Sequence, residues 1–335
     1  MEWIEDGGVL SAAGFRTGAA RCGLKTASDQ PDVAVLTSTS PARGAGVFTT
    51  NRFAAAPVQW CRRLLPSANV RALVVNAGNA NACTGERGIE DVHRCAELVA
   101  GSLGCRSEQV LTASTGVIGK PLPMDRLMQG IRQACAGLSG EAEAMRRAER
   151  AIMTTDTRPK AAAARAEIGG VPFHVGGMAK GAGMIAPHMA TMLCFVTTDA
   201  SVTEDVLESL LREAVGTTFN SITVDGDSST NDCVIALASG ASGASVQPGE
   251  QSGEVFGQAL RALLGELATQ IVRDAEGATR LIRVRIRTAQ DDEDARKAAR
   301  AVAESQLLKC AVYGGDPNWG RIVCALGYSG AQVVP

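Results

Sequence analysis

Ala190 and Thr191 are small residues in the middle of an apolar run, GAGMIAPHMATMLCFV from Gly181 to Val196. A buried strand favours β-branched and aromatic side chains over Ala. A threonine hydroxyl can act as a nucleophile when a base lies beside it. If the bond before Thr191 is cut, its new α-amine, with a pKa of about 7.7 to 8.0, can serve as that base. The pair indicates either a self-cleaving threonine nucleophile or a buried strand with an incidental threonine.

Self-cleavage needs a backbone that bends at the scissile bond. The Thr191 hydroxyl attacks the Ala190 carbonyl, the acyl group shifts from nitrogen to oxygen, and water hydrolyses the resulting ester. The small Ala190 side chain, with Gly181 and Gly183 nearby, favours such a bend. The tetrahedral intermediate then requires hydrogen-bond donors for its oxyanion.

Clusters of Thr, Asn, Gly and acidic residues recur beside apolar segments and can supply such donors. Each cluster alone is consistent with a turn whose hydroxyls are satisfied, but together they predict an active site built from hydroxyls and backbone amides. They are NAGNANACTG (76–85), STGVIG (114–119), TTDTRP (154–159), MAKGAGM (178–184) and DGDSSTND (225–232).

Other chemistries find little support in the residue spacing. The ten cysteines form no Cys-x-x-Cys pair, and His93, His174 and His188 have no metal-ligand spacing, so we expect reduced thiols and no metal. The glycine-rich stretches lack GxxxxGK and GxGxxG, which argues against nucleotide binding. No GxSxG elbow is present, which argues against a serine hydrolase.

Composition narrows the class of partner. The 335 residues carry a net charge of -2 and a pI of about 6.0, so no excess of cations is available for nucleic acid or an anionic membrane. The first residues, MEWIEDGGVL, are acidic where a secretion signal is basic, and no apolar run is long enough to span a membrane. We expect a cytoplasmic protein with neither nucleic-acid nor membrane partners.

Hydrophobic periodicity places helices and strands in alternation, as in an α/β protein. An apolar stripe from Ile89 to Leu103 predicts a helix, and Ser201-x-x-Glu204 resembles a capping box before a helix at 203–215. The remaining predicted elements are strands at 33–38, 70–76 and 281–287 and a helix at 254–272.

Six segments resemble the ornithine acetyltransferase family, the bifunctional enzymes of arginine biosynthesis, and follow one another along nearly the whole chain. They are VVNAGNANACTG (74–85), ASTGVIGKPLPM (113–124), AIMTTDTRPK (151–160), KGAGMIAPHMATMLCFVTTDA (180–200), ITVDGDSSTNDCV (222–234) and GGDPNWGRI (314–322). The resemblance implies a layered α/β sandwich of stacked β-sheets with helices outside.

The resemblance also implies roles for individual residues. Cleavage falls between Ala190 and Thr191, and Thr191 accepts the acyl group and contacts substrate. Thr115 supplies a side chain, and Gly116 a backbone N–H, to the oxyanion. The implied substrate-binding residues, besides Thr191, are Thr155, Lys180 and Glu276. A cation at Lys180 suits a substrate carboxylate and the carboxylate of Glu276 suits an amine, although a surface salt bridge is the alternative for either.

The implied reaction transfers an acetyl group from N-acetylornithine to Thr191 and then to glutamate, with neither metal nor cofactor. Some members of the family also use acetyl-CoA. The implied chains are an α chain, 1–190, and a β chain, 191–335, which pair into a heterotetramer. His188 departs from the family pattern, and the sequence stops before a typical member would end, without the tail that normally reaches the substrate site.

Two other functions stay open from the residues. An autoproteolytic aminopeptidase or amidase with an N-terminal Thr would transfer its acyl group to water instead of glutamate. A non-catalytic relative would remain uncleaved.

Overall fold

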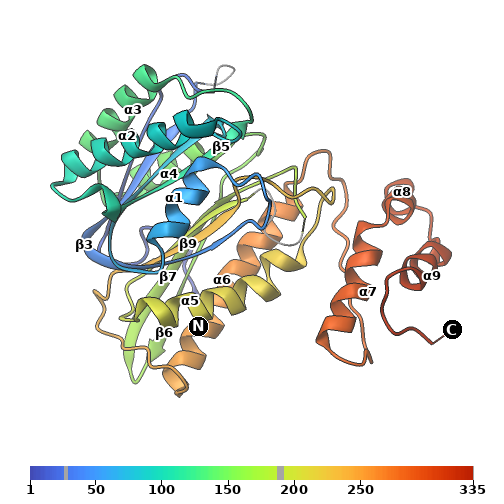
Figure 1. The fold of residues 1–335 in the computed structure, drawn as a ribbon. Coiled ribbons are helices and arrows are strands. Elements are labelled where there is room, and N and C mark those ends of the chain that lie inside the picture. The colour runs from blue at the N-terminus through green and yellow to red at the C-terminus, as the bar shows by residue number, and fades with distance from the viewer. Residues whose placement is uncertain (26–28, 187–191, 335) are drawn as a thin grey trace.

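The computed structural model describes residues 1–25, 29–186 and 192–334 (Figure 1). The described chain forms a large β-sheet flanked by helices, which confirms the α/β class. Its elements are β1 (Glu2–Trp3), β2 (Phe15–Ala20), β3 (Val33–Phe48), α1 (Ala56–Leu64), β4 (Ser67–Asn79), α2 (Gly85–Leu103), η1 (Ser107–Gln109), β5 (Val110–Val117), α3 (Met124–Ala136), α4 (Ala142–Ile152), β6 (Lys160–Ile168), β7 (Val171–Lys180), β8 (Leu193–Thr198), α5 (Glu204–Thr217), η2 (Phe219–Ser221), β9 (Cys233–Ala238), α6 (Gln251–Arg273), α7 (Asp292–Glu304), α8 (Gln306–Gly314) and α9 (Trp319–Gly327).

Hydrogen bonds join nine strands of the described chain into one sheet. The strand order is β1-β6-β7-β8-β9-β3-β4-β5, and β2 pairs with β3 off this path. The pairs β4–β5 and β8–β9 are parallel. The other neighbouring strands are antiparallel.

Strand β3 connects the two halves of this sheet. Its first part pairs with β2 and β4, and its last part, Arg43 to Phe48, pairs with β9. The β3–β4 register shifts between Thr37 and Ala42 and again between Ala42 and Gly44. Irregularities of this kind bend a strand and increase its twist. The bend lets one half of the sheet face the other.

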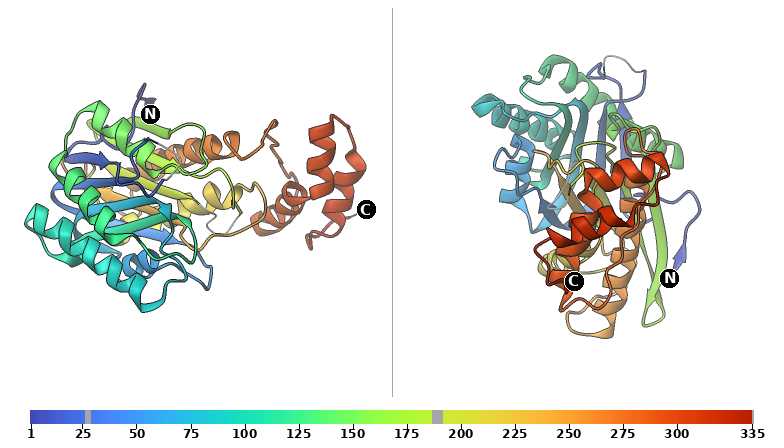
Figure 2. Two further views of the ribbon diagram at one scale, coloured as in Figure 1. Left: turned by 90° about the horizontal axis from the view of Figure 1, so that it is seen from above. Right: turned by 90° about the vertical axis from the view of Figure 1, so that its right-hand side faces the viewer.

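Buried side chains from both halves meet in one apolar cluster. This cluster combines Val35 and Leu73 of the β2–β5 half with Phe195 and Ile235 of the β6–β9 half. Alternate residues of β8, such as Val196, enter a second cluster with α5 and α6. Helices α2 and α3 lie on the opposite side of the molecule from α5 and α6 (Figures 1 and 2). The expected stacked sheets are therefore one continuous sheet that is folded on itself.

Most elements predicted from periodicity are confirmed, but the capping box is wrong. The strands at 33–38 and 70–76 lie within β3 and β4, and the predicted helices within α2, α5 and α6. Helix α5 begins at Glu204 with Thr203 as its N-cap, and no side chain caps it. Ser201 instead pairs through its backbone N–H and C=O with Ala244 and Val246. These long-range hydrogen bonds hold Ser201 outside the first turn of the helix.

The predicted strand at 281–287 is also wrong. This segment forms neither helix nor strand and pairs with no strand of the described chain, although its residues alternate between exposed and half-buried. Val284 packs against a small apolar cluster of Val302, Leu308 and Ala325. The alternation matches the half-buried positions of the segment, but alternation alone does not provide a partner strand.

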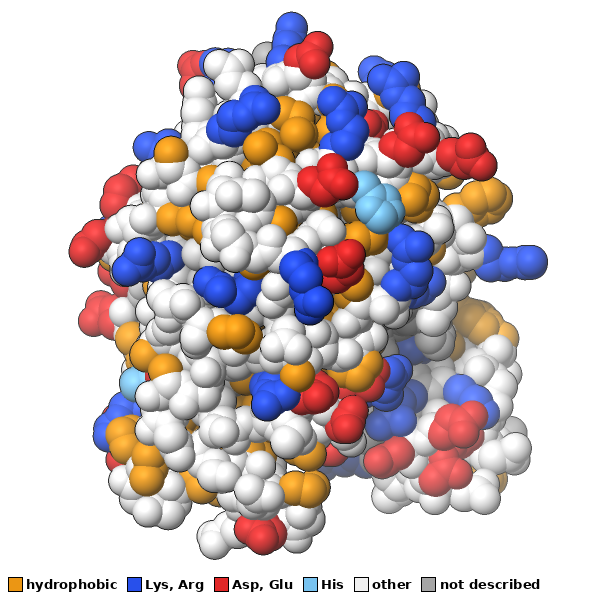
Figure 3. All heavy atoms as spheres, turned by 60° about the vertical axis from the view of Figure 1, so that its left-hand side comes forward, with side chains coloured by type: hydrophobic (Ala, Val, Ile, Leu, Met, Phe, Trp, Pro, Cys, Tyr) orange, Lys and Arg blue, Asp and Glu red, His pale blue; other side chains and the backbone are white. Residues whose placement is uncertain are grey.

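Helices α7, α8 and α9 form an arm beside the folded sheet (Figures 1 and 2). Over half of the exposed large apolar side chains of the described chain belong to residues from 281 onward, among them Tyr313, Trp319 and Tyr328. The arm therefore has an apolar surface, in contrast to the face in Figure 3, where acidic and basic side chains alternate. Among the described helices, none combines the length and apolar character that crossing a membrane requires.

Candidate active site

The fold brings Thr115 and Lys180 into contact although 65 residues separate them. Thr115 lies near the end of β5 and Lys180 is the last residue of β7, so the two side chains come from opposite halves of the sheet. The Lys180 ammonium donates a hydrogen bond to the Thr115 hydroxyl, with 3.3 Å between Nζ and Oγ1. Both residues are buried. A buried cation thus contacts the hydroxyl that the sequence indicates as an oxyanion donor.

Gly116 follows Thr115 at a point where only glycine fits. Its φ is +130°, and a Cβ at this position would lie 2.3 Å from the carbonyl carbon of Gly78 and 2.5 Å from the backbone nitrogen of Asn79. Strands β4 and β5 therefore approach each other here more closely than any side chain would permit. The backbone of Gly116 is exposed beside the buried Thr115.

Two carboxyl groups set the charge around Lys180. Burial lowers the pKa of the Lys180 ammonium, and Asp156 and Asp232 raise it only in part. Burial raises the pKa of Asp156, but Lys180 and Lys160 lower it by more, so the carboxyl stays ionised. Burial raises the pKa of Asp232 well above its ordinary value. Asp156 is therefore the stronger anionic partner of Lys180.

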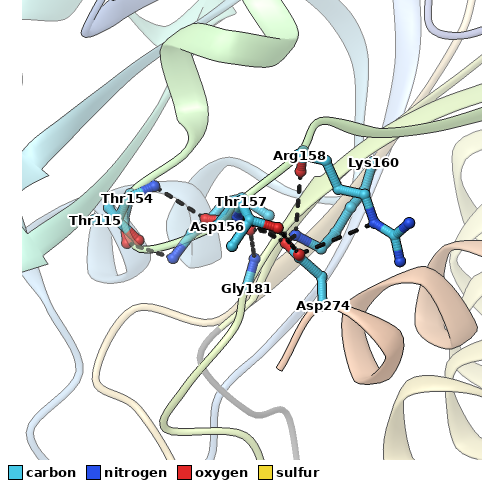
Figure 4. Close-up of polar contacts among 9 residues, drawn as sticks. Thr115, Thr154, Asp156, Thr157, Arg158, Lys160, Gly181 and Asp274 are labelled. Atoms are coloured by element: carbon cyan, nitrogen blue, oxygen red, sulfur yellow. Dashed lines mark hydrogen bonds and ion pairs between the residues drawn. The ribbon is translucent and has the colours of Figure 1, made fainter. Parts of the chain in front are cut away.

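Lys160 lies between the buried carboxylates of Asp156 and Asp274 (Figure 4). Its ammonium is 2.6 Å from Oδ1 of Asp156 and 2.6 Å from Oδ2 of Asp274, and the side chains of Lys160 and Asp156 are fully buried. Asp274 lies 114 residues from Lys160, directly after α6. The three side chains join the TTDTRPK segment to the end of that helix.

The same carboxylates hold the backbone around the site. Asp156 accepts hydrogen bonds from the backbone N–H of Thr154 at 2.9 Å and of Gly181 at 2.7 Å, and thereby fixes the start of the glycine-rich segment after Lys180. Asp274 accepts from the backbone N–H and the hydroxyl of Thr157. Thr155 lies in an exposed bend between these anchored residues.

Glu276 contacts the glycine-rich segment that follows Lys180. Its backbone N–H donates to the Ala182 carbonyl at 2.8 Å, and a Cβ on Gly183 would lie 2.8 Å from the Glu276 carboxyl carbon. The exposed Glu276 carboxylate also lines a cavity of about 920 Å³ between α6 and the arm. Neither Thr115 nor Lys180 lines this cavity, so the cavity does not include the contact between these two side chains.

The cleavage pair falls outside the described residues, as does His188. Ala190 and Thr191 both belong to 187–191. Within the described ranges no group of three or more His, Cys, Asp and Glu side chains has the arrangement of a metal site.

Sequence reasoning missed several residues that build the site: Asp156, Lys160, Asn231, Asp232 and Asp274. Four of the five belong to segments that the sequence had singled out, TTDTRPK and DGDSSTND. The signal for Asp156 and Lys160 was their opposite charge at a spacing of four residues. Nothing in the sequence around Asp274 indicated a partner more than one hundred residues away.

Comparison with known proteins gives matches along the whole chain. A sequence model of the ArgJ family matches residues 16–335. The arginine biosynthesis bifunctional protein ArgJ of Symbiobacterium thermophilum is 54% identical over 337 residues, which cover 100% of this chain and 83% of that protein. The Thermus thermophilus protein of the same description is 51% identical and matches 96% of this chain and 81% of its own.

Solved structures agree with these matches. Ornithine acetyltransferase from Mycobacterium tuberculosis, solved with ornithine, is 38% identical with a TM-score of 0.52, and the match covers 55% of this chain and 97% of that one. An aminopeptidase from Ochrobactrum anthropi, described as a variant of the Ntn-hydrolase fold, has a TM-score of 0.50 at 12% identity and covers 81% of this chain and 86% of its own. The aminopeptidase shares the fold alone.

Replacing Lys160 by Met should destabilise the protein strongly, because Asp156 and Asp274 would lose their shared buried cation. Breaking a buried ion pair from one side typically costs about 3 to 5 kcal/mol. Urea unfolding at neutral pH measures this loss. The control is Lys297→Met, since Lys297 pairs with Glu293 at the surface and should leave the unfolding free energy nearly unchanged. Equal effects of the two substitutions would contradict the role given to the buried cluster.

Lowering the pH should weaken the ion pairs of Lys160 with Asp156 and Asp274. Burial raises the pKa of Asp274, but hydrogen bonds from Lys160 and Thr157 lower it by more, so the pKa of the folded state is below the ordinary value, as it is for Asp156. The stabilisation is complete above the unfolded pKa of about 3.9 and is lost as the pH falls through the folded one. Between about pH 5 and pH 3, the unfolding free energy of Asp274→Asn should therefore fall less steeply than that of the unmodified protein. Parallel curves would exclude Asp274 from this pH dependence.

Proposed function

The chain belongs to the ArgJ family, and from that membership we propose that it is an ornithine acetyltransferase of arginine biosynthesis. N-Acetylornithine donates its acetyl group to Thr191 and leaves as ornithine, and glutamate then accepts the acetyl group as N-acetylglutamate. The observation that carries this proposal is 54% identity to a curated ArgJ protein over the full length of this chain. The contact between Lys180 and Thr115 agrees with it.

We propose that the chain first cleaves itself into an α chain, 1–190, and a β chain, 191–335. The Thr191 hydroxyl attacks the Ala190 carbonyl, an ester forms as the C–N bond breaks, and water releases the α chain. The solved chain of the Mycobacterium tuberculosis ornithine acetyltransferase supports this division. The match covers 55% of this chain but 97% of that one, so that chain is far shorter than 335 residues and close to the length of an α chain.

Acetyl transfer then uses the freed α-amine of Thr191 as a base. The amine takes the proton of the Thr191 hydroxyl as its oxygen attacks the acetyl carbonyl, and the oxyanion accepts hydrogen bonds from the Thr115 hydroxyl and the Gly116 N–H. The Lys180 ammonium donates to the oxygen of Thr115, so the hydroxyl proton remains available for the oxyanion. Collapse of the intermediate returns the proton to the departing ornithine amine.

Charged residues around this contact suit an amino-acid substrate. Lys180 supplies a cation for a carboxylate, and Glu276 supplies an exposed carboxylate for an amine beside the glycine-rich segment. Thr155, in the exposed bend beside Asp156, supplies a further hydroxyl. N-Acetylornithine carries a carboxylate and a free side-chain amine, so it can pair with both charges. Glutamate can pair its carboxylate with Lys180, while its single amine must be free to attack the acetyl group.

Further properties belong to the same proposal. The family resemblance implies acetyl-CoA as a second acetyl donor to glutamate, and the curated relatives are described as bifunctional. The resemblance also implies that the α and β chains form a heterotetramer, and we assign the protein to the cytoplasm.

Thr191→Ala should remain a single chain of 335 residues, whereas the unmodified protein should give fragments of 190 and 145 residues. The substitution removes the only oxygen that can attack the Ala190 carbonyl in this mechanism. Intact mass under denaturing conditions, with the N-terminal sequence of the smaller fragment, measures the outcome. Thr191→Ser is the matched control and should still cleave. Cleavage before residue 191 in the alanine variant would exclude the proposed nucleophile.

Thr115→Ala should slow acetyl transfer by about 100- to 1000-fold, the usual loss when one oxyanion donor is removed. The measurement is the formation of N-acetylglutamate from N-acetylornithine and glutamate by cleaved protein, and Thr115→Ser, which keeps the hydroxyl, is the control. Omitting glutamate distinguishes a transferase from an amidase, because an amidase would release free acetate at the full rate. A nearly normal rate for folded, cleaved Thr115→Ala would remove Thr115 from the mechanism.

A further inference from the structure

The DGDSSTND segment (225–232) lies between η2 and β9, and the acetyl-transfer steps proposed above assign it no part. We propose that Asn231 and Asp232 are positioning residues that fix the distance between the oxyanion donors and the nucleophile. This inference rests on the proposed acetyl transfer at Thr191. Its basis is that two consecutive side chains bind the two backbone segments that must meet in the reaction.

Asn231 binds the oxyanion side. Its Nδ2 donates one hydrogen bond to the Ala80 carbonyl at 2.7 Å and another to the Ser114 carbonyl at 2.8 Å. Its Oδ1 accepts from the Thr230 hydroxyl at 2.6 Å, which orients the amide. The Ser114 carbonyl belongs to the planar peptide unit that ends at the Cα of Thr115. The side chain of Asn231 therefore fixes the backbone from which Thr115 projects.

Asp232 binds the nucleophile side. The fully buried carboxyl group accepts the backbone N–H of Met192 at 2.9 Å and that of Ser229 at 3.3 Å. The Met192 carbonyl in turn accepts from the backbone N–H of Cys233 at 3.2 Å. Both polar groups of Met192 are thus fixed, and its N–H belongs to the peptide unit that links it to Thr191.

The two attachments cannot move independently. Consecutive Cα atoms are about 3.8 Å apart across a trans peptide, so Asn231 and Asp232 act as one short rigid connector. Asn231 reaches β5 of one half of the sheet, and Asp232 reaches the start of β8 in the other. The connector therefore spans the two halves at the place where Thr115 and Lys180 meet.

Asp225, at the beginning of the same segment, holds the chain before the cleavage pair. Its carboxylate accepts the backbone N–H of Met184 at 2.6 Å and of Ile185 at 2.9 Å. Asp225 and Asp232 thus bind the described residues on both sides of 187–191. One segment of eight residues sets the ends of the scissile region and its separation from the oxyanion donors.

A positioning role predicts a selective loss of rate. Misplacing reacting groups by about 1 Å can cost about 100-fold in rate. Lys180 and Glu276, which supply the charges for substrate, lie outside the 225–232 segment. Asn231→Ala should therefore lower the kcat of acetyl transfer by about 100-fold and change the KM for N-acetylornithine by less than about threefold.

The matched control is Asp199→Asn. Asp199 is buried directly after the far end of β8 and, like Asp232, accepts two backbone N–H groups, from Ala13 at 3.1 Å and His174 at 2.7 Å. This variant should lose stability without a selective fall in kcat. Asp232→Asn keeps one oxygen for the Met192 N–H and should retain more activity than Asp232→Ala. An unchanged kcat in folded Asn231→Ala, or a kcat for Asp199→Asn that falls equally, would overturn the positioning role.

Two further measurements keep the test decisive. If Asn231→Ala does not fold, Thr230→Val removes only the hydroxyl that orients the Asn231 amide and should lower kcat by about tenfold. Hydrogen exchange in Asp232→Ala, which removes the acceptor of the Met192 N–H, should accelerate at Met192 but not at the far end of β8, and this readout needs no substrate. Absence of acetyl transfer by the unmodified protein would contradict the proposed function, whereas unchanged exchange at Met192 would contradict the role of Asp232.

Discussion

The folding of one continuous sheet on itself at β3 is the constraint on which the rest of the structure depends. Because the same strand pairs with β2 and β4 at one end and with β9 at the other, the two halves cannot separate without breaking backbone hydrogen bonds. Their inward side chains share one apolar cluster. This arrangement brings the end of β5 to the end of β7, and so places Thr115 against Lys180.

Closing the two halves also buries charge, which the structure compensates by pairing. Two lysines and three aspartates of the site lie inside the fold: Lys160, Lys180, Asp156, Asp232 and Asp274. Removing such groups from water is costly unless each is paired and hydrogen-bonded, and Lys160 contacts both carboxylates at 2.6 Å. The remaining carboxylate oxygens accept backbone N–H groups. Charge pairing therefore also determines where the backbone of the site runs.

Hydrogen bonds between distant segments hold together the backbone that carries the proposed site residues. Gly116 permits an approach of β4 and β5 that no other residue would allow, and Asn231 then binds the carbonyls of both segments. Glu276 reaches the glycine-rich segment because Asp274, two residues earlier, is anchored by Lys160 and Thr157. Preorganised donors of this kind need no rearrangement as charge develops, which is the usual source of oxyanion stabilisation.

The sequence by itself determined most of the local elements and the family. Periodicity placed α2 and α6 and the β3 and β4 strands, because side-chain spacing along one segment records which face is buried. The ordered motifs identified the family, and the sequence named Thr115, Lys180 and Glu276, which the fold brings to one region. Local patterns also predicted a helix cap at Ser201 and a strand at 281–287. Both predictions are wrong, because a local pattern does not reveal whether a distant backbone segment pairs with it: Ser201 pairs with Ala244 and Val246, and 281–287 pairs with no described strand. Only the tertiary structure decided that Lys160 binds Asp274 and that Asn231 binds Ser114, because each contact joins residues more than one hundred positions apart.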